Sequence, residues 1–153
     1  NSRDNARTPM QWTDDENAGF TDGTPWLAMN PNYRQINVRE QEARTDSVLA
    51  YYRRLVHLRK ADAYRETFTY GIFEPAYQEM ADVFAYYRVS GESGQRILVA
   101  ANFGTDAVSL TLAYPCRQVL LSNLRAESAV ETACEKANAL TLGSCEVAVI
   151  ELG

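Results

Sequence analysis

The pattern of apolar and polar residues divides the chain into three unequal segments. Residues 1–44 follow neither a helical nor a strand period. They are rich in Asn, Pro, Gly, Thr and charge, and large apolar residues such as Trp12, Phe20 and Trp26 stand singly. A structureless segment of this length is unusual inside a compact domain. We therefore interpret it as a functional loop or as a segment packed against something else.

The second segment reads DSVLAYYRRLVHLRKA over residues 46–61 and predicts an amphipathic helix. Thr45 or Asp46 can cap its first turn, and the basic residues Arg59 and Lys60 suit the C-terminal end of the helix dipole. The predicted apolar face consists of Val48, Tyr52, Leu55, Val56 and Leu58. A face this broad needs a large partner surface.

From about residue 67 the period changes to two, which is typical of strands. Apolar residues alternate in DVFAYYRV, and SGESG at 90–94 supplies a hairpin turn. Further strands are predicted over 97–103, 108–112, 117–121, 138–142 and 146–152, whereas the polar segment 122–137 is expected to form a long loop or a short surface helix. Short strands separated by turns predict a mainly β fold, an antiparallel β-sandwich.

Composition narrows the classes of partner. The chain has 153 residues with a net charge of −5, and its 15 basic residues are scattered among 20 acidic ones, so we expect no nucleic-acid partner. Its apolar runs are too short to cross a bilayer, so no membrane partner is expected either. The N-terminus lacks a leader-like pattern, and three cysteines without a CxxC motif favour reduced thiols and a cytoplasmic location. We expect no metal and no cofactor, because neither metal-ligand spacing nor a nucleotide motif is present.

The opening stretch, NSRDNARTPMQW, holds the most informative polar group: Arg3, Asp4 and Arg7. An arginine is a planar fork of donors that can hold a carboxylate or sugar hydroxyls, and an aspartate adds an acceptor, as a polyol ligand requires. By residue type alone, surface ion pairs or capped carbonyls are the simpler interpretation of these side chains.

Other reactive or aromatic side chains have simple structural explanations. The acidic run at 14–16 is typical of a solvated loop, and His57 lies within the predicted helix with no nucleophile motif for it to serve. Trp12 and Trp26 could stack on sugar rings, but anchoring the loop to a core is the simpler role. Residue types alone therefore indicate a β-domain with a helical arm and no visible active site.

A family resemblance changes this interpretation. The stretch SRDNARTPMQW is followed by NAGF (17–20), GTPW (23–26), NPNY (30–33), INV (36–38), DS (46–47) and YYRRLVHLRK (51–60). This series resembles the oligo-1,6-glucosidase branch of the α-amylase superfamily, glycoside hydrolase family 13. The branch includes dextran glucosidases, α-glucosidases, trehalose-6-phosphate hydrolases and trehalose synthases. The remaining residues are similar in pattern to the C-terminal β-domain of those enzymes.

The resemblance implies a fragment of a retaining exo-acting α-glucosidase. In this family a (β/α)₈ barrel carries the catalytic carboxylates upstream of the RDNARTPMQW loop, and a barrel needs about 250 residues. We therefore expect residues 1–62 to be the C-terminal remnant of a barrel, its substrate loop and final helix, and residues 63–153 to be the β-sandwich. No catalytic residue is expected in the chain, which should be inactive alone.

The resemblance also implies roles for individual residues. Arg7 matches the arginine that holds the non-reducing-end glucose of an α-linked gluco-oligosaccharide and pairs with an upstream aspartate. Arg3 and Asp4 are expected to contribute as its neighbours, and Gln11 and Trp12 to brace the loop. Without the barrel as partner, we expect the first 40 or so residues to be disordered, rearranged or covered by a neighbouring chain, and the barrel-facing surface to support self-association.

Three alternatives stay open at this point. The chain could be a non-catalytic module that stabilises a barrel or binds glucan through exposed coplanar aromatics, with Tyr70, Tyr77, Tyr86 and Tyr87 as candidates. The parent could be a trehalose-6-phosphate hydrolase or a trehalose synthase. An unrelated β-sandwich with a chance loop match is the third.

Overall fold

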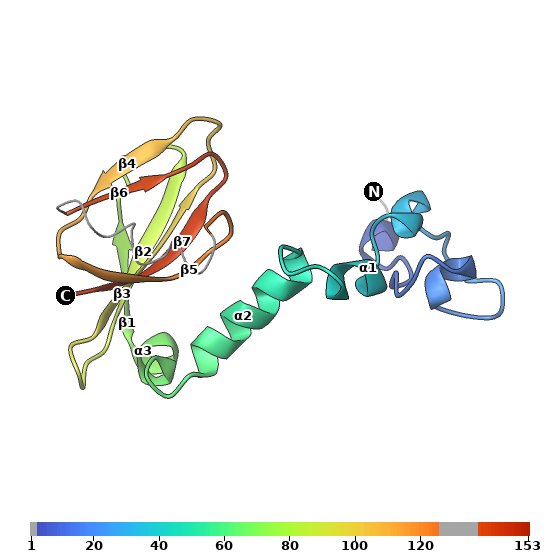
Figure 1. The fold of residues 1–153 in the computed structure, drawn as a ribbon, viewed down its shortest axis with the longest axis horizontal. Helices are drawn as coiled ribbons and strands as arrows, with labels where there is room; N and C mark the ends of the chain where they lie inside the picture. The colour runs from blue at the N-terminus through green and yellow to red at the C-terminus, as the bar shows by residue number, and fades with distance from the viewer. Residues whose placement is uncertain (1–2, 126–137) are drawn as a thin grey trace. The chain divides into compact units, whose positions relative to one another are not determined.

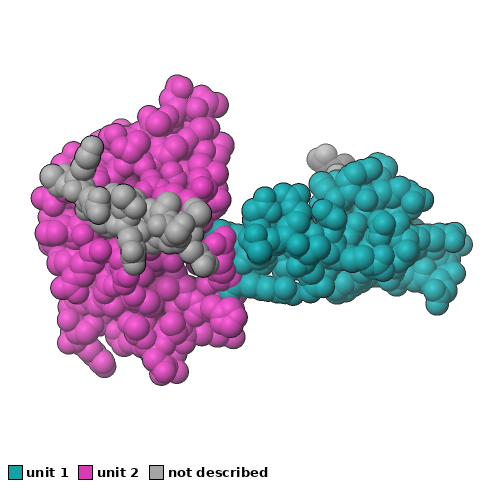
Figure 2. Space-filling model, in the orientation of Figure 1, with its two compact units in different colours: residues 1–53 teal, residues 54–153 magenta. Residues whose placement is uncertain are grey.

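A computed structural model describes residues 3–125 and 138–153 of the chain. These residues separate into two compact units, residues 1–53 and residues 54–153 (Figure 2), and each is described by itself. Most of the predicted loop or helix at 122–137 lies outside the described residues.

The first unit is built from short turns rather than from long elements. Three 3₁₀ turns, η1 (Arg3–Ala6), η2 (Glu16–Gly19) and η3 (Pro31–Arg34), precede a short helix, α1 (Val38–Glu42) (Figure 1). Asn side chains cap two of these elements: Asn30 accepts from the backbone N–H of Asn32, and Asn37 accepts from that of Glu40. The segment is therefore irregular, as its pattern predicted, but hydrogen-bonded turns give it a defined backbone.

The predicted helix is α2 (Val48–Lys60), and its cap differs from the prediction. Ser47, rather than Thr45 or Asp46, accepts from the backbone N–H of Ala50 at 3.1 Å and donates to the carbonyl of Gln41 at 2.7 Å. Asp46 instead pairs with Arg44 at 3.0 Å. The helix therefore begins two residues later than its apolar pattern suggested.

The apolar face of α2 is only partly covered by the described residues. The helix has no buried residue, and Val48 and Tyr52 are 76% and 62% exposed. Trp12 and Trp26, at 48% and 81% exposed, are not anchored in a core either. Because solvent-exposed apolar surface of this kind marks an interaction site, the first unit and α2 present a surface that needs a partner.

The second unit contains the predicted antiparallel strands (Figure 1). A five-stranded sheet has the order β1 (Ile72–Ala76), β2 (Val83–Val89), β3 (Arg96–Asn102), β7 (Val147–Leu152) and β5 (Cys116–Ser122). The strands β4 (Val108–Thr111) and β6 (Ala139–Leu142) pair as a second sheet. The mainly β, antiparallel fold is confirmed, although the sequence pattern missed β1 and the short helix α3 (Arg65–Tyr70) before it.

The core lies between the two sheets. Leu98 of β3 stands opposite Ile150 of β7, and both contact a cluster that includes Leu110 of β4 and Leu140 and Leu142 of β6. Each of these five side chains is almost fully buried, and burying one stabilises the fold by about 1.5–3 kcal/mol. Alternate residues of β2, β3, β4, β6 and β7 enter this core, which explains the period of two.

The redox state of the cysteines differs from the expectation. Cys116, at the start of β5, is disulfide-bonded, whereas Cys145 is a free and exposed thiol. The prediction that all cysteines are reduced is therefore wrong. Because disulfides persist mainly in oxidising compartments, the cysteines give no support to the expected cytoplasmic location.

Candidate substrate-binding site

Arg3, Asp4 and Arg7 lie together on the first turn of the first unit. Arg3 and Asp4 belong to η1, and the backbone N–H of Arg7 donates to the carbonyl of Asp4 at 2.9 Å. All three side chains are exposed. The backbone turn thus places Arg3, Asp4 and Arg7 within five consecutive residues with their side chains exposed.

Arg7 has an aromatic partner that sequence reasoning did not identify. Its guanidinium carbon lies 4.9 Å from the ring centroid of Trp26, in the range of a cation–π contact. Trp26 was interpreted as a loop anchor or a sugar platform, and no spacing rule connects it with position 7. The one sequence signal for the pair is that Arg7 and Trp26 both lie in fragments that carry the family resemblance, SRDNARTPMQW and GTPW.

The segment after Arg7 is braced by the NPNY and INV fragments and by the backbone of Arg39. The side-chain amide of Gln11 donates to Asn32 Oδ1 at 3.1 Å and to the carbonyl of Ile36. The backbone N–H of Val38 donates to the carbonyl of Gln11 at 2.9 Å, and that of Arg39 donates to the carbonyl of Trp12 at 3.0 Å. The NPNY and INV fragments therefore hold the backbone of residues 11 and 12 in place.

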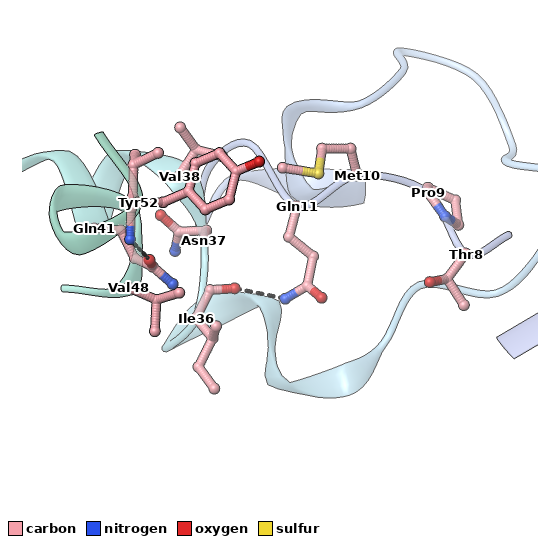
Figure 3. A pocket seen from close by; sticks show the side chains of 11 residues that line it. Thr8, Pro9, Met10, Gln11, Ile36, Asn37, Val38, Gln41, Val48 and Tyr52 are labelled. Carbon is pink, nitrogen blue, oxygen red and sulfur yellow. Dashed lines mark hydrogen bonds between the residues drawn. The ribbon is translucent and has the colours of Figure 1, made fainter. Parts of the chain in front are cut away.

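An apolar pocket of about 420 Å³ opens beside this segment (Figure 3). Loop residues Pro9 and Met10 lie on one side of it, and Val48 and Tyr52 of α2 lie on another (Figure 3). The other lining residues are Thr8, Gln11, Ile36, Asn37, Val38, Gln41 and Leu49. Because most of the exposed lining is apolar, the pocket suits an apolar side chain better than a sugar.

The acidic run forms surface ion pairs instead of a catalytic pair. Arg39 contacts Asp14 at 2.9 Å and Asp15 at 2.8 Å, and all three side chains are more than half exposed. The pKa of Asp15 is lowered first by a hydrogen bond with Thr13. A hydrogen bond with Arg39 and the positive charge of that guanidinium lower it further. Asp15 is therefore ionised at neutral pH and does not serve as a proton donor.

Neither a metal centre nor a histidine site appears in the part of the chain that the structure describes. Residues 3–125 and 138–153 contain no group of three or more His, Cys, Asp or Glu side chains placed to hold a metal ion. His57 is exposed on α2. No helix among the same residues is long and apolar enough to span a bilayer.

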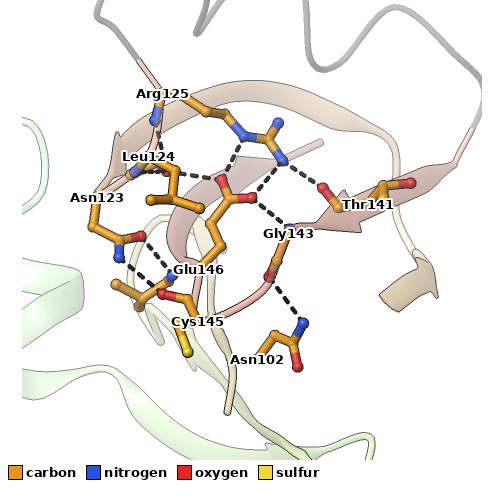
Figure 4. Close-up of polar contacts among 10 residues, drawn as sticks. Asn102, Asn123, Leu124, Arg125, Thr141, Gly143, Cys145 and Glu146 are labelled. Carbon is orange, nitrogen blue, oxygen red and sulfur yellow. Dashed lines mark hydrogen bonds and ion pairs between the residues drawn. The ribbon is translucent and has the colours of Figure 1, made fainter. Parts of the chain in front are cut away.

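A second polar cluster surrounds Glu146 at the start of β7 (Figure 4). Glu146 is only 4% exposed, and Arg125 Nε donates to its Oε1 at 2.6 Å. The Ser122 hydroxyl donates to the same oxygen, and the backbone N–H of Gly143 donates to Oε2, both at 2.8 Å. Because both carboxylate oxygens already accept from protein donors, the cluster is a clamp between strands and not a ligand site.

The clamp predicts a pH-dependent part of the stability. Burial raises the pKa of Glu146, but bonds from Arg125, Gly143 and Ser122 outweigh it and leave the pKa below its ordinary value. A carboxylate that is more acidic when folded stabilises the fold at pH above about 4.5, and this contribution is lost as the pH falls through the folded pKa.

We therefore expect Glu146→Gln to be less stable than the native chain at pH 7. The difference in free energy of unfolding between the two proteins should become smaller as the pH falls from 7 to 3.5. Urea unfolding of both proteins at several pH values measures this difference. Replacing the exposed Glu92 with glutamine is the control and should change little at any pH. A difference for Glu146→Gln that stays constant with pH would contradict the expectation.

The sequence is similar to a known protein family and to several of its members. Residues 1–71 match the family model described as alpha amylase, catalytic domain. The chain is 42% identical over 129 residues to the glucan 1,6-alpha-glucosidase of Streptococcus pneumoniae, covering 84% of this chain and 23% of that protein. It is 44% identical over 104 residues to the oligo-1,6-glucosidase of Bacillus cereus, covering 68% of this chain and 18% of that protein.

The fold of the chain is also similar to that of solved structures. The chain superposes on the crystal structure of isomaltulose synthase from Klebsiella sp. LX3 with a TM-score of 0.86 and 36% identity, covering 99% of this chain and 26% of that one. The chain thus spans about a quarter of the length of these relatives or less. Residues 1–71 belong to the α-amylase family, and the chain is similar to a part of the enzymes of the oligo-1,6-glucosidase branch of glycoside hydrolase family 13.

Proposed function

We propose that the chain is the substrate-positioning and C-terminal part of a retaining exo-acting α-glucosidase that hydrolyses small α-linked gluco-oligosaccharides. Residues 1–62 complete the catalytic barrel, and residues 63–153 form the β-sandwich beside it. The observation that carries this proposal is the exposed turn with Arg3, Asp4 and Arg7 inside the segment that matches the catalytic-domain model.

In this proposal Arg7 positions the sugar and performs no bond chemistry itself. Its fork donates to the hydroxyls of the non-reducing-end glucose and to a carboxylate from the rest of the catalytic domain, while Arg3 and Asp4 shape the same rim. Holding the ring in one orientation brings the anomeric carbon into near-attack geometry. The reaction then uses two carboxyl groups about 5–5.5 Å apart, as retaining glycosidases require.

The exposed apolar surface supports a barrel partner. Met10, Ile36 and Val48 line the open pocket and are each at least half exposed, and α2 has no buried residue. In the complete protein the rest of the barrel covers these side chains. In the isolated chain a second copy can cover them, so sedimentation of the chain should reveal self-association.

The proposal predicts that the isolated chain has no glycosidase activity. The catalytic carboxylates lie in the rest of the catalytic domain, so incubation with p-nitrophenyl α-glucoside should give no nitrophenol above background. The complete protein at the same concentration is the positive control. Turnover by the isolated chain would overturn the assignment of catalysis to residues outside it.

The structure gives less support to a glucan-binding β-module. Tyr77 and Tyr87 pack against the core, so they are not available as a platform. Tyr86 lies on a strand with aromatic neighbours, but its ring plane is tilted by 32° to Phe73 and by 62° to Phe84. A flat sugar platform needs coplanar rings, which these are not.

The alternative parent activities, hydrolysis of trehalose 6-phosphate or synthesis of trehalose, leave the role of Arg7 unchanged. Each of them also holds a terminal α-glucosyl unit, so the positioning argument applies equally. Product analysis of the complete protein with isomaltose, trehalose 6-phosphate and maltose separates them, since each activity consumes a different one of these sugars.

A further inference from the structure

Trp26 lies far out on the surface of the first unit, where a large aromatic side chain needs an explanation. It is 81% exposed, and its ring faces the guanidinium of Arg7 at 4.9 Å. Contact with a core does not explain its position, because the side chain has so little cover. Its stacking on Arg7 is the interaction that connects it with the candidate site.

The loop that carries Trp26 is fixed by a tightly turned segment. The side-chain amide of Asn17 donates to the carbonyls of Thr21 at 3.2 Å and Gly23 at 3.0 Å. Asn17, Ala18 and Gly19 all have positive φ, at 51°, 54° and 65°. Two of them are not glycine, so this backbone is strained and persists only because its surroundings hold it.

Hydrogen bonds to the braced loop hold that strained segment. Ala18 is fully buried, and its carbonyl accepts from the backbone N–H groups of Trp12 at 2.9 Å and Thr13 at 3.0 Å. The same stretch of chain that follows Arg7 therefore supports the turn that holds the loop before Trp26. Residues 12 and 13 therefore connect the segment that carries Arg7 with the loop that carries Trp26.

We infer that Trp26 is a positioning residue for Arg7. A guanidinium stacks on an aromatic face through its π surface, which leaves its in-plane N–H donors free for a ligand. An exposed arginine otherwise samples many rotamers, so the stack holds the fork in one orientation before the sugar arrives. This inference rests on the proposed function, namely that Arg7 contacts the substrate.

The test compares four variants of the complete protein: Arg7→Ala, Trp26→Ala, Trp26→Phe and the double variant Arg7→Ala/Trp26→Ala. We expect Trp26→Ala to lower kcat/KM for a small α-glucoside by about 2- to 5-fold, the range of an exposed cation–π pair of about 0.5–1 kcal/mol. The loss should appear mainly in KM, because the stack is present before and during reaction. Trp26→Phe should recover most of it, since a phenyl ring still offers a stacking face.

The double variant should be no worse than Arg7→Ala alone, because Trp26 acts through Arg7. The matched control is Arg34→Ala, which removes a guanidinium that faces the Tyr33 ring at 5.1 Å outside the predicted site and should leave kcat/KM unchanged.

Three results would overturn the inference, and they are distinguishable. No loss in Trp26→Ala while Arg7→Ala loses activity rejects the role of Trp26 and leaves the proposed function intact. Additive losses in the double variant show that Trp26 contacts the sugar itself. No loss in Arg7→Ala rejects the proposed function together with the inference. Far-UV circular dichroism of every variant shows whether a loss reflects misfolding, and Trp26→Phe repeats the comparison with the ring retained.

Discussion

Replacing Arg7 with alanine in the complete protein is expected to lower kcat/KM for p-nitrophenyl α-glucoside about 100-fold. A hydrogen bond to a charged group contributes about 1.5–3 kcal/mol, and a ring that loses its fixed orientation reacts about 100-fold more slowly. Arg7 lies on the exposed turn beside Asp4 and forms no ion pair with the described residues, so its donors remain available to the sugar. Steady-state kinetics of the purified variant measures the effect.

Two controls make this result specific to the fork of Arg7. Arg7→Lys should remain at least 10-fold impaired, because an ammonium keeps the charge but loses the planar pair of donors. Arg34→Ala removes an arginine that also stacks on an aromatic ring in the same unit, and it should keep native kinetics. Equal losses in Arg7→Ala and Arg34→Ala would indicate a general charge effect and contradict the assigned role.

Replacing Arg125 with alanine is expected to lower the free energy of unfolding of the β-sandwich by about 3–5 kcal/mol. The reason is that the substitution leaves Glu146 buried without its charged partner, and breaking one side of a buried pair costs this much. The Arg125 side chain is 19% exposed and that of Glu146 is 5% exposed, so solvent has little access to the bond between them. Urea unfolding of the isolated chain, followed by its β-sheet circular dichroism, measures the change.

An exposed ion pair of the same unit provides the matched control. Asp62 and Arg65 lie 3.6 Å apart with side chains that are 95% and 66% exposed, and such pairs contribute about 0–1 kcal/mol. Asp62→Ala should therefore change the unfolding free energy by less than about 1 kcal/mol. A loss for Arg125→Ala as small as that for Asp62→Ala would show that the clamp does not stabilise the sandwich.

The strands were predictable because their residues obey one simple rule. Alternation in β2 and β3 places Ala85, Leu98 and Ala100 in the core, and turn residues separate the strands. The strand β1 was not predicted because four of its five residues are exposed. Its sequence therefore shows no alternation between buried apolar and exposed polar residues. The start of α2 escaped because Ser47 and Asp46 are both good caps, and the choice depends on contacts with Gln41 and Arg44.

The candidate site was predictable only in part. The motif that contains Arg3, Asp4 and Arg7 is readable as sequence, and in the structure Arg3 and Asp4 lie in η1 with Arg7 directly after it, but their role at a substrate stays a prediction. The stack of Arg7 on Trp26 and the burial of Glu146 are long-range contacts that depend on loop geometry. Residue patterns describe local periods and turns, so contacts between loops leave no signal in them.

We propose that these residues belong to a retaining exo-acting α-glucosidase. The most direct test is a proton NMR time course of p-nitrophenyl α-glucoside with the complete protein, since this substrate releases a single glucose whose anomeric form can be followed. A retaining enzyme should hydrolyse the substrate rapidly, with α-glucose appearing first and β-glucose forming only later by mutarotation. Absence of hydrolysis, or β-glucose as the first product, would contradict the proposal.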